Sequence, residues 1–269
     1  YNVTITELST SCTMDTSITI LQPDSIDVSG SSVDILCNGD DNGSVNISIS
    51  GGNAPVNWSW VSSDPAFVDP GSNATNLSPL DGGSYTVSVS DNLGCIKDTT
   101  FVVNEPDVIM TSGVVNDVSC SGLIDGSITL SLTGGTGTLN TAWTSSVIGF
   151  FDPNTDNLSG LDSGTYSLSI IDDNGCIYDT SFVLSTPAPI FANGTKTDVS
   201  CYGFADGSID LSTSNGNTPY QWSWTASNGF TSSDEDILAL DTGIYNVTIT
   251  ELSTSCTMDT SITILQPDS

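Results

Sequence analysis

The sequence YNVTITELSTSCTMDTSITILQPDS occupies residues 1–25 and returns unchanged as residues 245–269. Two unrelated segments do not match at 25 consecutive positions by accident. A repeat of this kind indicates an array of similar modules, so the fold has to be interpreted module by module. The copies lie 244 residues apart, too far for one small module. We therefore expect the chain to be a window of a longer periodic polypeptide that forms a fibre or stalk.

Seven cysteines divide this long period into shorter modules. One class stands in the motif C-x-G-x-x-[DN]-G-S, and the other opens an alternating segment such as CIKDTTFVV. The first class is Cys37, Cys120 and Cys201, and the second is Cys12, Cys95, Cys176 and Cys256. Members of the second class recur after 83, 81 and 80 residues, so the repeat unit has about 80 residues.

Proline marks the end of each module, in LQPDS, NEPD, STPAP and again LQPDS. A proline at this place ends the last strand and stiffens a short linker. We expect the last two strands of a preceding module at 1–25. Three full modules follow, at 26–106, 107–188 and 189–269.

The pattern inside each module predicts β-strands. Segments such as VNISIS, ITLSLT, YTVSVS and YSLSI alternate apolar with polar residues, and no segment has the 3.6-residue period of a helix. Gly-Gly pairs and the DNLG and DDNG segments indicate hairpin turns. About seven short strands in each 80-residue unit predict an all-β fold. We expect tandem immunoglobulin-like β-sandwich modules of about 80 residues in an extended array.

Aromatic residues repeat at fixed places in the modules. A segment L-D-x-G-x-Y precedes one alternating strand, and it is similar to the tyrosine corner of immunoglobulin-like folds. A tryptophan on a middle strand is expected to point into the core. The predicted structural residues are Tyr85, Tyr166, Tyr245, Trp60, Trp143 and Trp224.

Charge and composition exclude several classes of function. The chain has 32 acidic residues against two lysines and no arginine, and its net charge is −30. Nucleic-acid binding needs lysine and arginine, and an anionic membrane repels such a surface. No apolar run reaches the roughly 18 residues that direct insertion into a membrane requires. Without histidine, the usual nucleophilic triads are missing. We expect no catalytic residue, no enzyme activity and no bound cofactor, calcium apart.

Acidic turn residues are candidates for calcium ligands. They are Asp41, Asp125 and Asp206 in the opening loops, and Asp91, Asp172 and Asp173 in the turns before the second-class cysteines. Carboxylate oxygens are the ligands that calcium prefers. The simpler interpretation is that these residues form turns on an acidic surface, where Asp is common.

The combined motifs resemble the SprB-type repeat of Bacteroidetes surface adhesins. The carrying residues are the C-x-G-x-x-[DN]-G-S opening, the tryptophan-bearing middle strand and the L-D-x-G-x-Y strand that precedes the second cysteine. The chain departs from the pattern at Asn42, at Asn215–Gly216, in the single Trp143 of the second module and in the ELSTSC close. The resemblance implies a very large protein on the cell surface, exported by type 9 secretion. It also implies filaments for adhesion and, in some members, gliding motility.

The cysteines allow three pairings. Pairing across each linker is disfavoured, because 25 mostly extended residues span roughly 60–80 Å and a disulfide needs Cα atoms within about 7 Å. Pairing within a module gives Cys37–Cys95, Cys120–Cys176 and Cys201–Cys256. Sandwich topology instead places the two cysteines of a module at opposite poles, and then the neighbours that meet across junctions are Cys37–Cys176 and Cys120–Cys256. The sequence leaves both of the last two pairings open. In either of them, we expect a cysteine without a partner to have that partner in a part of the longer polypeptide outside these 269 residues.

These patterns predict the shaft of a long extracellular adhesin, with neighbouring modules of the same chain as partners. Other copies in a filament are a second class of partner. In one alternative the repeats themselves bind polysaccharide or another surface ligand through exposed aromatic side chains. In another, the protein is a static, self-associating fimbria or sheath.

Overall fold

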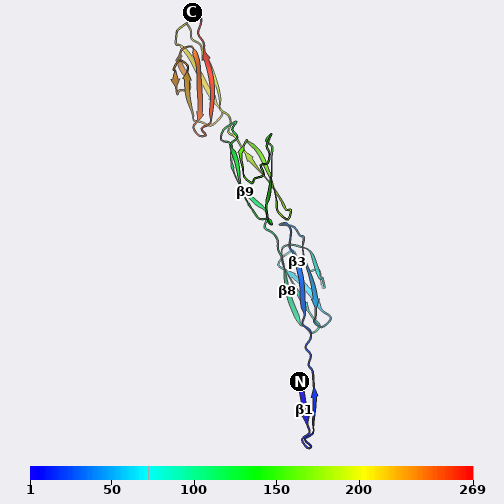
Figure 1. Ribbon diagram of the computed structural model, residues 1–269. Helices are drawn as coiled ribbons and strands as arrows, with labels where there is room; N and C mark the ends of the chain where they lie inside the picture. Colours follow the sequence, from blue (N-terminus) through cyan, green and yellow to red (C-terminus); the bar gives the residue numbers. More distant parts are fainter. Residues whose placement is uncertain (72, 269) are drawn as a thin grey trace. The chain divides into compact units, whose positions relative to one another are not determined.

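The computed structural model describes residues 1–71 and 73–268, and its regular elements are β-strands (Figure 1). Within these residues no helix is long and apolar enough to cross a membrane. The first strands are β1 (Asn2–Thr6), β2 (Thr13–Ser17), β3 (Asp27–Val33), β4 (Gly43–Ser50), β5 (Asn57–Ser62), β6 (Asn76–Leu80), β7 (Gly83–Ser90) and β8 (Ile96–Val103). The second module holds β9 (Met110–Asn116), β10 (Gly126–Thr133), β11 (Asn140–Ser145), β12 (Leu158–Leu161), β13 (Gly164–Ile171) and β14 (Ile177–Leu184). The third holds β15 (Phe191–Thr197), β16 (Gly207–Ser214), β17 (Tyr220–Ala226), β18 (Thr231–Ser232), β19 (Ile237–Leu240), β20 (Gly243–Glu251) and β21 (Thr257–Ile264).

Each module is a sandwich of two antiparallel sheets. In the first module the sheet orders are β3-β4-β6 and β5-β7-β8, and the second module repeats them with β9-β10-β12 and β11-β13-β14. The third module adds the short β18 to the edge of β17. The predicted all-β, tandem immunoglobulin-like fold is therefore confirmed. Among the described residues the first two modules have six strands each and the third has seven, because only the third has a strand, β18, that pairs with the edge of the middle strand.

By internal contacts the chain divides into two compact units. The first is residues 1–109 together with two turns of the second module, residues 134–138 and 172–176. The second unit is residues 110–133, 139–171 and 177–269. The strands of every sheet fall inside one of the four predicted segments.

Strand alternation builds the core of each sandwich. On β7, Tyr85, Val87 and Val89 are buried while the residues between them are partly exposed. The middle strand β5 contributes the buried Trp60, whose ring lies against Phe101 of β8. Corresponding residues on β13 and β20 are also buried, as are Trp143 and Trp224. Every second residue of these strands therefore points into the core, as the alternating sequence predicts.

The buried tyrosines form the tyrosine corners that the sequence predicts. The hydroxyl groups of Tyr85, Tyr166 and Tyr245 each donate to the carbonyl oxygen of the aspartate four residues earlier, at 2.8, 2.9 and 2.9 Å. A phenylalanine from the loop after the middle strand meets each tyrosine ring edge-on, which favours aromatic packing. These phenylalanines are Phe67, Phe150 and Phe230, with ring centroids 5.3, 5.4 and 5.4 Å from their tyrosines.

Glycines in the first strand of each module let it approach the last strand closely. A Cβ atom at Gly113 of β9 would clash with the ring of Phe182 on β14. Gly194 of β15 faces Ile262 of β21 in the same way. In the first module, β3 lies beside β8 (Figure 1). Glycine is required at these positions by the space available, since none of them has a positive φ.

Side chains cover the free edge of the middle strand in the first two modules. The backbone N–H of Trp60 donates to the carboxylate of Asp69 at 3.2 Å, and that of Trp143 donates to Asp152 at 2.9 Å. In the third module β18 pairs with this edge instead. An edge N–H that already has an acceptor is a poor template for strand addition by another chain.

The repeated 25-residue sequence adopts one hairpin in two environments. The pairing of Asn2 with Ser17 in β1–β2 matches that of Asn246 with Ser261 in β20–β21. The side chain of Tyr1 is 83 % exposed, whereas that of Tyr245 is 0 % exposed and lies in the third core. The local sequence therefore suffices for the register, while burial comes from the other strands of a module.

This identity of sequence makes a direct test of packing possible. Because intrinsic exchange rates are set by sequence, any difference in amide exchange between residues 2–17 and 246–261 reports tertiary protection. We expect the strand amides of 246–261 to exchange at least about a hundredfold more slowly, since a lone two-stranded hairpin is marginal in water. NMR resolves the two copies, and equal protection of both would contradict this assignment of the core.

Candidate functional site

The opening loop of each module is closed by the acidic or amide residue of its motif. Asn42 accepts the N–H of Leu36 at 3.1 Å, directly before Cys37. Asp125 accepts the N–H of Ser119 at 3.0 Å, and Asp206 that of Ser200 at 2.9 Å, directly before Cys120 and Cys201. Asn42 therefore replaces aspartate without loss of this bond. In two loops the serine hydroxyl also donates to the carboxylate, and these bonds lower the pKa of Asp125 and of Asp206.

The closing turn of each module is built around one buried acidic side chain. Asp91 accepts the N–H groups of Leu93 and Cys95, each at 2.9 Å, and that of Asn53 from a neighbouring turn at 3.1 Å. Hydrogen bonds from Asn53 and Cys95 hold the pKa of Asp91 below its usual value. The N–H of the second-class cysteine is thus fixed by the carboxylate.

The second and third modules reproduce this turn with a variation. Asp172 accepts from Asn174 and Cys176 at 2.9 Å and from Thr136 at 2.8 Å. Burial raises the pKa of Asp172, but the N–H groups of Cys176, Thr136 and Asn174 outweigh it and keep the pKa below its usual value. In the third module the buried Glu251 accepts from Asn217 at 2.9 Å, and its longer side chain serves a turn that is one residue longer.

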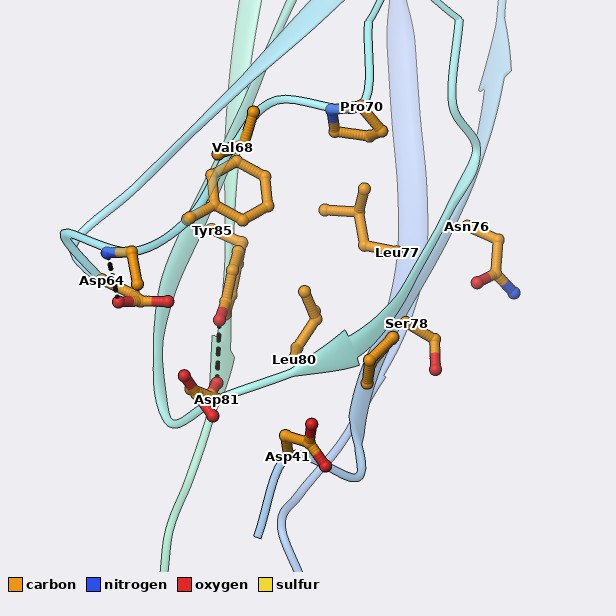
Figure 2. Close-up of a pocket in the computed structure, with 13 residues that line it drawn as sticks. Asp41, Asp64, Val68, Pro70, Asn76, Leu77, Ser78, Leu80, Asp81 and Tyr85 are labelled. Carbon is orange, nitrogen blue, oxygen red and sulfur yellow. Dashed lines mark hydrogen bonds between the residues drawn. The ribbon is translucent and has the colours of Figure 1, made fainter. Parts of the chain in front are cut away.

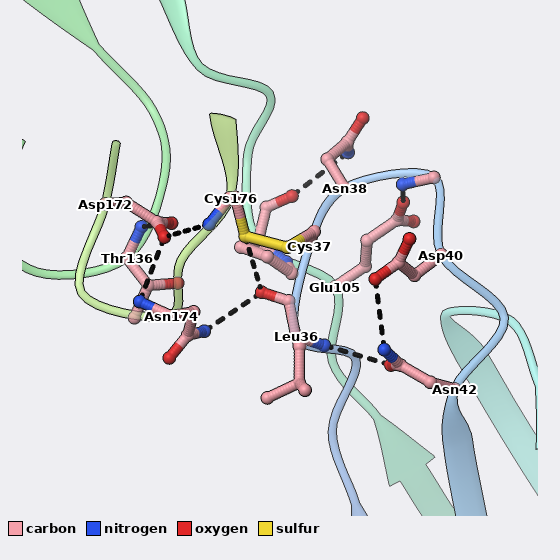
Figure 3. The surroundings of a disulfide bond; sticks show 12 residues. Leu36, Cys37, Asn38, Asp40, Asn42, Glu105, Thr136, Asp172, Asn174 and Cys176 are labelled. Atoms are coloured by element: carbon pink, nitrogen blue, oxygen red, sulfur yellow. Dashed lines mark hydrogen bonds between the residues drawn. A yellow bond between two sulfur atoms is a disulfide. The ribbon is translucent and has the colours of Figure 1, made fainter. Parts of the chain in front are cut away.

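Disulfides join the opening loops to closing turns of the following module. Cys37 is bonded to Cys176 and Cys120 to Cys256, with Cα atoms 5.5 Å apart in both. Figure 3 shows Asn174 donating to the carbonyl oxygen of Leu36 at 2.9 Å beside the first bond. The structure therefore contains the predicted pairing across junctions and departs from the alternative within modules. Cys12, Cys95 and Cys201 are exposed free thiols among the described residues.

Strand geometry explains why a module cannot close its own disulfide. In the first module the N–H of Ile35, two residues before Cys37, donates to the carbonyl of Asn104, just past the end of β8. Cys95 lies just before the start of the same strand. Eight residues of strand cover about 26 Å, whereas bonded cysteines need Cα atoms within about 7 Å. The two cysteines thus belong to opposite ends of the sandwich.

The candidate calcium ligands are not gathered into one place. Asp91, Asp125, Asp172 and Asp206 are used as acceptors within their own loops. Asp173 is exposed on its turn, and Asp41 lies at the edge of a separate pocket. In residues 1–71 and 73–268 no group of three His, Cys, Asp or Glu side chains is placed to hold a metal ion.

A pocket of about 350 Å³ lies beside the tyrosine corner of the first module. Figure 2 shows Leu77, Leu80 and Val68 around it, with the hydroxyl of Tyr85 turned toward Asp81. A pocket of about 570 Å³ occupies the same place in the second module, beside Tyr166. Sequence reasoning missed both pockets, because they form where the loop bearing Phe67 or Phe150 folds over the tyrosine.

The family model of the SprB repeat matches residues 29–64, 112–145 and 193–229. Three separate segments of the chain, one in each module, therefore match the SprB repeat. Each match starts in the first strand of a module and includes its opening cysteine and its buried tryptophan. The closing turn and its cysteine lie outside every match. Each disulfide therefore links the matched part of one SprB repeat to the unmatched part of the next module.

Solved structures similar to this SprB-repeat chain contain tandem immunoglobulin domains. The eight N-terminal domains of Down Syndrome Cell Adhesion Molecule are 12 % identical over 98 % of this chain, with a TM-score of 0.35, and this chain covers 40 % of that one. For Dpr2 Ig1-Ig2 with DIP-Theta Ig1-Ig3 the identity is 9 % and the TM-score 0.35, and the match covers 90 % of this chain and 99 % of that one. For the four N-terminal domains of Dscam1 isoform 6.44 the identity is 13 % and the TM-score 0.24, and the match covers 95 % of this chain and 77 % of that one. Scores this low carry no argument about function. No curated protein matches the chain.

Replacing Asp172 by asparagine tests how the closing turn holds its cysteine. The folded pKa of Asp172 is depressed, so its carboxylate stabilises the turn above the unfolded value of about 3.9, and this contribution is lost as pH falls through the folded pKa. At pH 6 we expect the amides of Asn174 and Cys176 to exchange about tenfold faster in Asp172→Asn than in the parent chain, because a charged acceptor is lost. The difference should shrink once the pH falls below the folded pKa, because the parent carboxylate is then protonated too.

The matched control is Asp173→Asn, an exposed neighbour on the same turn. It should leave the exchange of both amides unchanged at either pH. A tenfold effect of Asp172→Asn that persists undiminished after the parent carboxyl group has been titrated, as followed by its own NMR signal, would show that geometry, and not the carboxylate charge, holds the turn.

Proposed function

We propose that this chain is the shaft of a repeat-containing adhesin at the cell surface, and that its work is mechanical. The observation that carries the proposal is the pair of disulfides that join the first two opening loops to the closing turn of the next module. Without these bonds, the short proline-containing linker would be the single covalent connection between two modules. A second covalent bond at the junction lets tension pass between modules without relying on that linker alone.

The chemistry of the chain supports an extracellular setting for this shaft. Structural disulfides persist in oxidising compartments and are rare in reducing ones. The net charge of −30 keeps long chains soluble and repels other copies, and the covered edges of β5 and β11 deter strand pairing. The SprB resemblance extends the proposal to export by type 9 secretion and to gliding motility. Neighbouring modules of the same chain are the proposed partners.

Polysaccharide binding and a catalytic role have less support than a shaft. Binding of polysaccharide by the repeats needs exposed aromatic side chains. The tryptophans Trp60, Trp143 and Trp224 are buried, and the exposed Tyr202 and Phe204 belong to the third opening loop alone. A catalytic role has no observation in its favour, and the SprB repeat and the immunoglobulin-like fold are of an adhesive or structural type. A static fimbria would use the same junction disulfides, so only an experiment on cells separates it from a gliding adhesin.

Beads coated with antibody against the second module test the proposal on living cells that produce the protein. Attachment of beads to intact cells is the expected result, with beads then carried along the surface because the shaft is coupled to a motor. Beads coated with non-immune antibody are the control and should not attach.

Three outcomes of this experiment distinguish a gliding adhesin, a static surface shaft and a protein that is not at the cell surface. Transport of the beads supports a gliding adhesin, and firm attachment without transport removes motility but keeps the surface shaft. Antibody that reaches its target only in permeabilised cells would overturn the location at the cell surface.

A further inference from the structure

The chain offers almost no sites to proteases of the trypsin class. These enzymes recognise a basic side chain before the bond that they cut, through a carboxylate in the specificity pocket. The sequence has no arginine and two lysines, so the susceptible bonds follow Lys97 and Lys196. Lys97 lies in β8 and Lys196 in β15, where its ammonium donates to Asp198 at 2.8 Å and to the carbonyl of Thr263 at 2.6 Å.

Both susceptible bonds lie inside loops that the disulfides close. The bond after Lys97 falls between Cys37 and Cys120, and the bond after Lys196 falls between Cys176 and Cys256. The two disulfides have sequence separations of 139 and 136, and their loops overlap between Cys120 and Cys176.

The overlap turns three backbone segments into parallel connections between the two disulfides. Residues 37–120, 120–176 and 176–256 each run from one disulfide to the other. A cut in any one segment leaves the other two intact. Cuts after both lysines still leave 120–176, which has no lysine or arginine.

We propose that the interlocked disulfides keep the chain covalently continuous after cleavage at every site that a trypsin-class protease can use. Each cut adds one water across a peptide C–N bond and leaves both S–S bonds unchanged. Fragment 1–97 stays bound through Cys37 to Cys176, and fragment 197–269 through Cys256 to Cys120. The proposal rests on the extracellular shaft proposed above, where host or environmental proteases meet the chain.

Digestion of the oxidised 269-residue chain tests this directly. The free thiols of Cys12, Cys95 and Cys201 are alkylated first, and the chain is unfolded in urea so that trypsin reaches both lysines. With reductant, three fragments should appear: 1–97, 98–196 and 197–269. Without reductant, one species should remain, at the 27.9 kDa of the chain plus the alkyl groups and two waters.

Single substitutions locate each connection. Cys37→Ser should release fragment 1–97 without reductant, and Cys256→Ser should release 197–269. Cys95→Ser, which removes a free thiol, is the matched control and should still give one species. Three separate fragments without reductant would overturn the proposal, because that is the result of pairing within each module. The digestion result is independent of whether antibody beads bind cells, so the two proposals fail separately.

Discussion

The disulfide between one module and the next depends on the length of an extended strand. Because β8 separates the two cysteine positions of the first module by about 26 Å, a bond between them would require the sandwich to collapse. The disulfide partners of Cys37 and Cys120 accordingly lie in the following module. The hydrogen bonds of Asn42 and Asp172 hold the backbone beside Cys37 and at Cys176, so that both bonded cysteines stand on side-chain-supported loops.

Much of this fold could be predicted because its signals are local and repeated. The alternation of apolar and polar residues on β7 and the tyrosine of the L-D-x-G-x-Y segment are visible in the sequence. The apolar residues and the tyrosine both face the core. The positions of the cysteines relative to the strands left pairing across junctions as one of two open possibilities, and it is the pairing that the structure contains. Calcium was the weaker interpretation of the aspartates, and the structure uses Asp91 and Asp172 to bind backbone N–H groups of their turns.

Other features could not be predicted because they depend on contacts between distant segments. Phe67 lies in an irregular loop, and its role appears only when the loop folds over Tyr85. Gly113 sits inside an ordinary strand pattern, and the reason for it is the ring of Phe182 on a strand more than sixty residues away. The acceptor that Asp152 offers to the edge of β11 also comes from a loop without a pattern. A single sequence cannot report such pairings, because neither partner shows which segment it meets.

Single-molecule stretching of a Cys12→Ser, Cys95→Ser, Cys201→Ser chain tests the covalent junctions most directly. Its shortest covalent path runs from residue 1 to 37, crosses to 176, returns to 120, crosses to 256 and ends at 269. That path has about 105 residues, so full extension should stop near 370 Å, and reductant should lengthen it to about 940 Å. Two results would contradict the junction disulfides. One is an oxidised chain that extends to about 740 Å, the length that a lone Cys120–Cys176 bond allows, and the other is an oxidised chain as long as the reduced one.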